Sequence, residues 1–251
     1  MSVSHPPDSP GTIESNRHSS RTLVSRLIPT RDGTPLEPRG MTTRACGHFS
    51  IVRRPASLVP AIFLDRDGTL IADVPYNGDP DRVQILPDVP AALRTMRRLG
   101  YRIIVVTNQS GIARGIINDA DVIRVHERLN DLLAAHDAWI DGYYYCPHHV
   151  DGRIPDLSQR CPCRKPGPGM IVRAAADWAI DLHRSWMIGD MLSDYEAGLQ
   201  AGCQALRLLI SNGVSNVDTH FGLFDAARLI ESFDEAAVAI SSGAPPAIRP
   251  E

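Results

Sequence analysis

The chain has 251 residues, of which 43% are hydrophobic and 22% charged, and a formal net charge of -3. This composition is typical of a globular protein with a buried core, and it argues against broad nucleic-acid binding, which needs a basic face. No apolar run approaches the roughly 20 residues that span a bilayer, and the N-terminus lacks the apolar segment of a secretory signal. We therefore expect a cytoplasmic monomer that acts on a small molecule, without membrane or nucleic-acid partners.

Residues 1–58 differ in composition from the rest of the chain. They are rich in Ser, Pro, Gly and Arg and show no sustained apolar periodicity. Such a segment cannot bury enough surface to offset the entropy of ordering it, so we expect a disordered or weakly ordered tail. An upstream start codon, with the natural start at Met41, would equally explain this segment. The folded domain is expected at 59–240, and 241–251 should form a second disordered tail.

From residue 61 onward, short apolar runs alternate with helical patterns. Strands are expected at 61–65, 101–109, 142–146, 185–190 and 203–210, and helices at 88–100, 117–138, 169–180 and 193–202. Strict alternation predicts an α/β domain with a doubly wound, mostly parallel sheet and helices on both faces. No insertion between Leu70 and the second strand is long enough for a separate cap domain. The site should therefore be open.

Polar sequences follow three of the expected strands, at the edge where doubly wound sheets bind ligands. They are DRDGTL from residue 65, TNQSGIARG from 107 and GDMLSD from 189. Asp65 and Asp67 are two residues apart, so in extended backbone they point to the same side. Converging carboxylates repel unless a cation or proton lies between them. With Asp190 from another strand they predict an oxygen-rich Mg²⁺ pocket.

These three sequences and the lysine of RKPGPG resemble, in order, the four motifs of the haloacid dehalogenase superfamily of phosphohydrolases. The resemblance covers roughly residues 61–210. It implies that Asp65 attacks phosphorus to form an aspartyl-phosphate, and that Asp67 protonates the leaving oxygen and then activates water. It also implies that Mg²⁺ is held by Asp65, the main-chain carbonyl of Asp67 and Asp190, with Asp194 as an outer support.

By the same resemblance, Thr107 and Lys165 stabilise the transferring phosphoryl group, the first by a hydrogen bond and the second by charge. Lys165 is the only lysine among the 26 basic residues, the others being arginine. A chain that otherwise uses arginine has kept a compact ammonium at this position. A localised charge on a flexible stem is therefore indicated there.

An irregular stretch from Tyr143 to Met170 contains the spacing Cys146-x-His148-x12-Cys161-x-Cys163. Four soft or borderline ligands in two pairs predict a tetrahedral, structural Zn²⁺ site. His149 is an alternative to His148. A disulfide would leave one cysteine and His148 unexplained. Because Arg164 and Lys165 follow the last ligand directly, a zinc-stapled loop would position both cations.

The zinc loop, its YYYCPHH lead-in and TNQSGIARG resemble a subgroup of the superfamily that acts on a heptose bisphosphate or on histidinol phosphate, and the loop length favours the former. Arg164 would recognise the phosphate that is not cleaved. The alternatives are histidinol-phosphate hydrolysis, a nucleic-acid 3′-phosphatase and a catalytically silent zinc-organised binding protein. The implied substrate contacts are Asp73, Val74, Pro75, Tyr76, Thr107, Asn108, Gln109, Ser110, Arg164 and Lys165.

Overall fold

The computed structural model describes residues 47–50, 57–209 and 229–242. Most of the two predicted tails lies outside these ranges, so the division into tails and domain stays a prediction. Two described segments extend beyond the predicted domain. Gly47–Ser50, inside the predicted N-terminal tail, forms a strand, and the last helix continues to Ser242.

The described residues form a seven-stranded sheet in the order β1-β4-β3-β2-β5-β6-β7. Only β1 runs antiparallel to its neighbour, β4. From β2 the chain builds the sheet in one direction to β4 and then returns to β5 on the other side, so β2 lies where the strand order reverses. This mostly parallel, doubly wound sheet confirms the predicted class. The strands are β1 Gly47–Ser50, β2 Ala61–Leu64, β3 Arg102–Asn108, β4 Gly142–Cys146, β5 Trp186–Gly189, β6 Gln204–Leu208 and β7 Leu229–Ile230.

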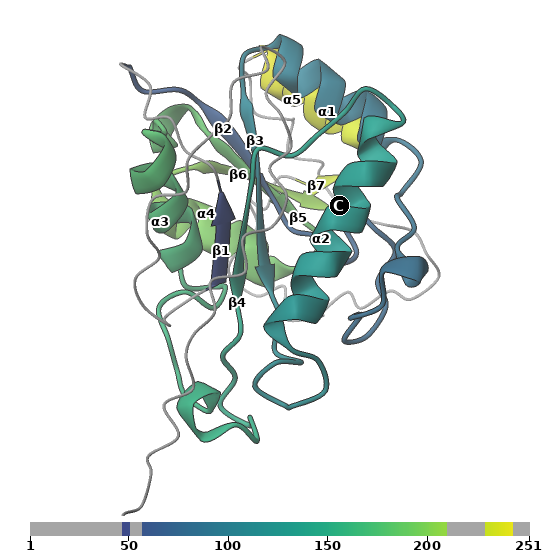
Figure 1. Cartoon of the computed structure of the whole chain (residues 1–251). Coiled ribbons are helices and arrows are strands. Elements are labelled where there is room, and N and C mark those ends of the chain that lie inside the picture. Colours follow the sequence, from purple (N-terminus) through teal and green to yellow (C-terminus); the bar gives the residue numbers. More distant parts are fainter. Residues whose placement is uncertain (1–46, 51–56, 210–228, 243–251) are drawn as a thin grey trace, which may run out of the picture. The chain divides into compact units, whose positions relative to one another are not determined.

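Helices cover both faces of the sheet, as predicted. Figure 1 shows α3 and α4 on one face and α1, α2 and α5 on the other. No segment within the continuous range 57–209 forms a separate cap domain between β2 and β3. The helices are α1 Val89–Arg98, α2 Asp119–Ala134, α3 Gly169–Trp178, α4 Leu192–Ala201 and α5 Phe233–Ser242, with short 3-10 turns at Pro80–Arg82, Pro155–Leu157 and Leu182–Arg184.

Burial on both faces explains why the central strands are continuous apolar runs rather than alternating ones. In β2, Ile62 and Leu64 join the core beneath α1, α2 and α5, whereas Ala61 and Phe63 join the core beneath α3 and α4. All four side chains are fully buried. The two cores hold the carboxyl end of β2 in a fixed position.

Local capping sets the helix ends, which differ from the predicted ones by at most four residues. Asn118 caps α2 and exchanges two hydrogen bonds with Asp121, of 3.1 and 2.8 Å, so the helix begins at Asp119, two residues after the predicted start. Ala179, with φ of 52°, ends α3. Leu99, which lies inside the predicted helix 88–100, follows the last turn of α1 and is 43% exposed.

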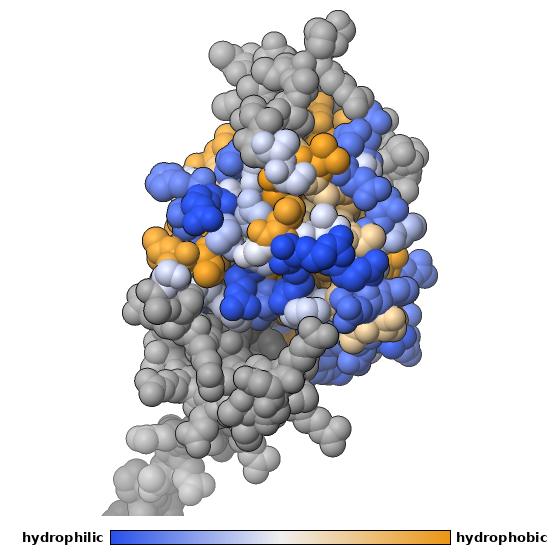
Figure 2. Space-filling model, turned by 90° about the horizontal axis from the view of Figure 1, so that it is seen from above, coloured by the Kyte–Doolittle hydropathy of each residue, from blue (hydrophilic) through white to orange (hydrophobic). Residues whose placement is uncertain are grey.

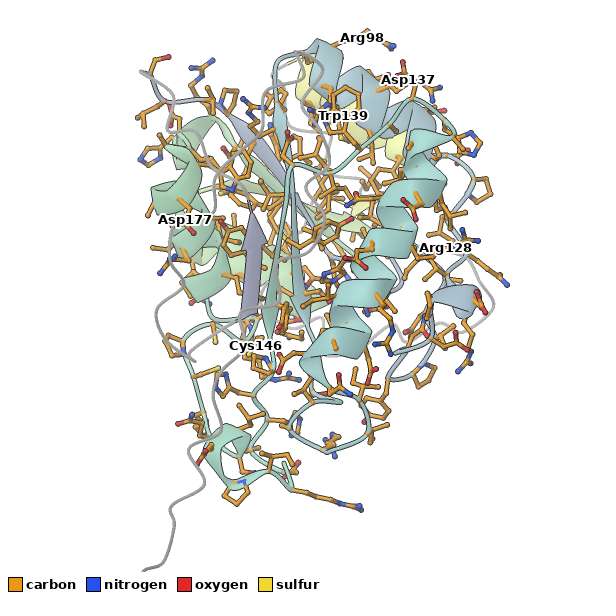
Figure 3. The ribbon with its side chains drawn as sticks, viewed as in Figure 1. Arg98, Arg128, Asp137, Trp139, Cys146 and Asp177 are labelled. Carbon is orange, nitrogen blue, oxygen red and sulfur yellow. The ribbon has the colours of Figure 1, made fainter. Side chains whose placement is uncertain are left out.

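The end of the domain that carries α1 and α5 is shown from above in Figure 2, where hydrophilic and apolar residues are interspersed among the described atoms. Trp139 and Asp137 lie toward this end in Figure 3, and Cys146 lies toward the opposite end. None of the described helices has the combination of length and apolar character that crossing a bilayer requires.

Asp141 links α1, β3 and β4 through one carboxylate. It accepts hydrogen bonds of 2.6 and 3.1 Å from Arg97, of 3.2 Å from Arg102 and of 2.8 Å from the main-chain N–H of Ile103. The Arg97 guanidinium also lies 3.7 Å above the ring of Trp139. The Asp141 side chain is only 7% exposed, so its bonds are little screened by water.

We expect Asp141→Asn to lower the free energy of unfolding by about 2 kcal/mol, because it removes charged hydrogen bonds from a buried group. Arg102→Ala should cost less than about 1 kcal/mol, since that arginine is 43% exposed and its ion pair is screened. Urea midpoints of the two variants measure both values. Equal losses would contradict this ranking.

Candidate active site

Two aspartates that the sequence predicts to meet lie at the ends of adjacent parallel strands. Asp65 follows β2 and Asp190 follows β5, and the register pairs Leu64 with Ile188. Asp194, in the first turn of α4, is completely buried beside them. Each of the three offers a carboxylate oxygen, and these oxygens all lie within 4.8 Å of one another.

The ammonium of Lys165 lies between two of these carboxylates. Its Nζ is 2.8 Å from Asp65 Oδ1 and 2.6 Å from Asp194 Oδ1. It also donates a hydrogen bond of 2.8 Å to the carbonyl oxygen of Val106. An ammonium has three N–H donors, and these three acceptors match them. Lys165, which is 4% exposed, can therefore act on a nearby anion mainly through its charge.

Burial and mutual repulsion shift the titration of this cluster. Burial raises the pKa of Asp65 to about 7; Lys165 opposes this, and Asp194 adds to it. Burial, with repulsion from Asp65, raises the pKa of Asp190 to about 6. Burial alone would lower the pKa of Lys165, but Asp194 and Asp65 outweigh that effect and raise it. When Asp65, Asp190 and Asp194 are ionised, these three carboxylates and the Lys165 ammonium have a net charge of two negative units. This charge favours the binding of a divalent cation.

The backbone beside Asp190 leaves room for this arrangement only because residue 68 is glycine. Gly68 has a φ of +76°, and a Cβ there would lie 2.7 Å from Asp190 Oδ2. Thr69 donates a hydrogen bond of 3.1 Å to Asp190 Oδ1.

Asp194 pairs with Lys165 and accepts a hydrogen bond of 3.0 Å from the Met191 N–H, as a supporting residue would. The oxygen donors suit Mg²⁺, and the main-chain ligand at residue 67 stays a prediction.

Asp67 belongs to a second group of polar side chains. Arg66 donates to both of its carboxylate oxygens, at distances between 2.9 and 3.2 Å. Gln109 Nε2 lies 2.8 Å from Asp67 Oδ2 and 2.9 Å from Thr107 Oγ1. Sequence reasoning missed Arg66, because an arginine between the two aspartates that are predicted to be catalytic usually indicates a surface position. Its exposed fraction is 0%.

A cavity of about 150 Å³ opens beside Asp67. Six of the predicted substrate contacts line it, whereas Pro75, Thr107, Arg164 and Lys165 do not. Asn77 was not predicted; it is 2% exposed, and its Nδ2 has no hydrogen-bond partner among the described residues. The lining residues are Asp67, Asp73, Val74, Tyr76, Asn77, Asn108, Gln109, Ser110 and Gly111.

The four residues of the predicted zinc site lie together after β4. The Sγ atom of Cys146 is 3.4 Å from that of Cys161 and 3.5 Å from that of Cys163. His148 Nδ1 is 3.7 Å from Cys146 Sγ and 3.6 Å from Cys163 Sγ. His149 lies outside the cluster and contacts Arg114 at 3.3 Å. The Sγ atoms of Cys161 and Cys163 are 3.1 Å apart, so the four side chains lie close enough to bind one metal ion.

Asn108 connects β3 to the segment that follows this cluster. Its Oδ1 accepts a hydrogen bond of 3.1 Å from the N–H of Lys165, and its Nδ2 donates one of 3.2 Å to the carbonyl of Lys165. Arg164 Nη1 lies 3.4 Å from the carbonyl oxygen of His148. The main chain of Lys165 is thus held by Asn108 two residues beyond Cys163.

Comparisons with known proteins agree with this geometry. Residues 162–236 match the model of the HAD-hydrolase-like family. The D-glycero-beta-D-manno-heptose-1,7-bisphosphate 7-phosphatase of Salmonella typhi is 43% identical over 158 residues, which cover 63% of this chain and 84% of that protein.

Two solved structures share the fold. A putative HAD-like phosphatase from Mesorhizobium loti has a TM-score of 0.69 at 35% identity, covering 82% of this chain and 97% of that one. The D,D-heptose 1,7-bisphosphate phosphatase of B. bronchiseptica, complexed with magnesium and phosphate, has a TM-score of 0.62 at 31% identity, covering 74% and 99%.

We expect Mg²⁺ to bind at least about tenfold more weakly near pH 5.5 than near pH 8, because protons compete for ligands with raised pKa values. The pKa values of Asp65 and Asp190 are about 7 and 6, so both carboxyl groups lose their protons between pH 5.5 and pH 8. The affinity for Mg²⁺ should therefore rise with pH across this range. Isothermal titration calorimetry at both pH values measures the affinity, with Asp190→Asn as the control that lacks one ligand. A pH-independent affinity would argue against this site.

Reduced protein should bind close to one equivalent of zinc, and Cys161→Ser should lose most of it, since a structural site needs all four ligands. Elemental analysis after dialysis in reductant measures the metal. Cys203, buried away from the cluster, provides the matched control, because Cys203→Ser should leave the zinc content unchanged. Full retention of zinc by Cys161→Ser would refute the predicted ligand set.

Proposed function

The chain belongs to the haloacid dehalogenase (HAD) family of phosphatases, and we propose that it removes the 7-phosphate from D-glycero-β-D-manno-heptose 1,7-bisphosphate. The observation that carries the proposal is the buried contact of 2.8 Å between Lys165 Nζ and Asp65, at the switch point of the sheet. The bisphosphate is the substrate named for relatives that are 43% identical and are spanned over most of their length. Their β anomer is the one we assign here.

The proposed reaction has two steps of phosphoryl transfer. A carboxylate oxygen of Asp65 attacks the 7-phosphorus, the bond from phosphorus to the sugar oxygen breaks, and Asp67 gives that oxygen its proton. Water then attacks the phosphorus of the aspartyl-phosphate and passes a proton to Asp67, the bond from phosphorus to Asp65 breaks, and phosphate leaves. Asp67 returns to its protonated form.

Other residues stabilise the transferring group. The charge of Lys165 and the hydroxyl of Thr107 would balance the negative oxygens of the phosphoryl group. When bound by Asp65, the carbonyl of Asp67 and Asp190, Mg²⁺ would supply further charge neutralisation. The thiol groups of Cys146, Cys161 and Cys163 and the imidazole of His148 would hold zinc in a structural role only.

Arg164, the residue before Lys165, would recognise a second phosphate, although it does not line the cavity. Arg164 and Arg114 both lie close to His149, whose pKa is lowered by burial and further by these two positive charges. A planar guanidinium such as that of Arg164 suits two hydrogen bonds to a phosphate. The open cavity lined by Asp73 and Ser110 would admit a small polar sugar. The monomeric state and the cytoplasmic location stay predictions from the sequence.

Phosphate release from a panel of substrates tests the proposal. The β-heptose bisphosphate should be hydrolysed at least about tenfold faster, in kcat/KM, than its α anomer, histidinol phosphate or a 3′-phosphorylated DNA end, because unpaired buried polar groups penalise the wrong ligand. A preference for histidinol phosphate would replace the assigned substrate, while leaving the family unchanged.

Asp65→Asn should lower kcat by at least about a thousandfold, since it removes the nucleophile. Asp177→Asn is the matched control on α3, where the aspartate pairs with the half-exposed Arg173 outside the site. Turnover of the Asp65 variant at the wild-type rate would reject the aspartyl-phosphate mechanism.

A further inference from the structure

Arg66 carries a positive charge into the interior of the domain. Its side chain is 1% exposed, and it stands between the two catalytic aspartates in sequence. The main-chain N–H of Arg66 donates a hydrogen bond of 2.7 Å to Asp65 Oδ1. Its side chain turns to Asp67, and both Nε and Nη2 lie within 3.2 Å of both carboxylate oxygens.

In the part of the chain that the structure describes, Asp67 is the only carboxylate that pairs with Arg66. His126 and Tyr143 are buried nearby, with ring centroids 4.2 Å apart. Burial lowers the pKa of His126 well below its usual value, and the charge of Arg66 lowers it further, so His126 is neutral. Arg66 Nη1 is buried and has no hydrogen-bond partner among the described residues. A buried guanidinium without a carboxylate is strongly destabilising, so Asp67 is costly to move away.

The two oxygens of the Asp67 carboxylate accept hydrogen bonds from different sets of donors. Oδ2 accepts from Gln109 as well as from Arg66, whereas Oδ1 accepts only from Arg66 among the described residues. The arginine therefore fixes the plane of the carboxylate, and Gln109 fixes one edge of it. Oδ1 is the oxygen left with more capacity to carry a proton toward the cavity, which Asp67 itself lines.

We propose that Arg66 is a positioning residue for the proton transfer by Asp67. The proposal rests on the mechanism given above, in which Asp67 protonates the leaving oxygen. The two-point contact with the guanidinium holds the carboxyl group at one angle, with Oδ1 toward the leaving oxygen. A lysine keeps the positive charge but cannot make two parallel hydrogen bonds, so Arg66→Lys separates positioning from charge.

The dependence on the leaving group distinguishes this role from a structural one. A phenolate needs a proton from Asp67 far more than a p-nitrophenolate does, because the latter is a stable anion. A disturbed fold lowers the hydrolysis of both aryl phosphates alike. A misplaced acid lowers the reaction of phenyl phosphate selectively.

The experiment compares kcat/KM of the full chain for phenyl phosphate and p-nitrophenyl phosphate, since kcat/KM covers the steps up to transfer of the phosphoryl group. For Arg66→Lys we expect a loss of about a hundredfold on phenyl phosphate and of less than about threefold on p-nitrophenyl phosphate, within the range of general-acid contributions. Arg97→Lys is the matched control, because Arg97 makes a similar two-point contact with Asp141 away from the site. It should leave the ratio of the two rates unchanged.

Equal losses on both substrates would overturn the proposal, as would an unchanged rate on phenyl phosphate. Circular dichroism establishes that the variant is folded, and Arg66→Gln replaces Arg66→Lys if the buried ammonium prevents folding. The two aryl phosphates have no second phosphate or sugar. If the wild-type enzyme does not hydrolyse the heptose bisphosphate, the proposed substrate is refuted. The role of Arg66 is decided separately, by the ratio of kcat/KM for the two aryl phosphates.

Discussion

The contact of the buried Lys165 ammonium with Asp65 and Asp194 is the interaction on which the site depends. Without it, three carboxylates at the end of β2 and β5 would face one another in a region from which water is largely excluded. Burial would then favour their protonated forms, and a protonated Asp65 is no nucleophile. Lysine suits this position because its three donors meet two carboxylates and the carbonyl of Val106. The larger, planar guanidinium of arginine would not fit the same three acceptors.

The position of Lys165 in turn depends on segments far apart in the sequence. It follows the Cys and His cluster by two residues, in a segment without regular secondary structure, and Asn108 at the end of β3 holds its main chain with two hydrogen bonds. A metal bound to the cluster would restrict this segment from one side while Asn108 restricts it from the other. In the proposed mechanism, the cluster therefore affects catalysis only through the placement of Lys165, because its own atoms lie outside the cavity.

The sequence predicts the parts of this molecule that local pattern controls. The central strands, each buried on both faces, appear as apolar runs, and the residues that follow them reach the same sheet edge because parallel strands end together. Strands β1 and β7 and the helix α5 were missed. The two strands are stabilised by pairing with β4 and β6, which are distant in the sequence, rather than by an apolar pattern of their own. Arg66 and Asn77 were missed for a related reason. Their burial is a consequence of tertiary packing, whereas their residue types usually indicate the surface.

The site separates its charges into two groups with different tasks. Asp65, Asp190 and Asp194 with Lys165 retain two negative charges when ionised, which suits a divalent cation and the transfer of a phosphoryl group. Asp67, which lines the cavity, forms a pair without net charge with Arg66 when its carboxyl group is ionised. Gln109 connects the pair to Thr107, on the phosphoryl side. In the proposed mechanism, Asp67 alternates between a protonated form and an ionised form whose charge Arg66 balances. Its proton can therefore pass to the leaving oxygen or return from water without changing the net charge of the group formed by Asp65, Asp190, Asp194 and Lys165.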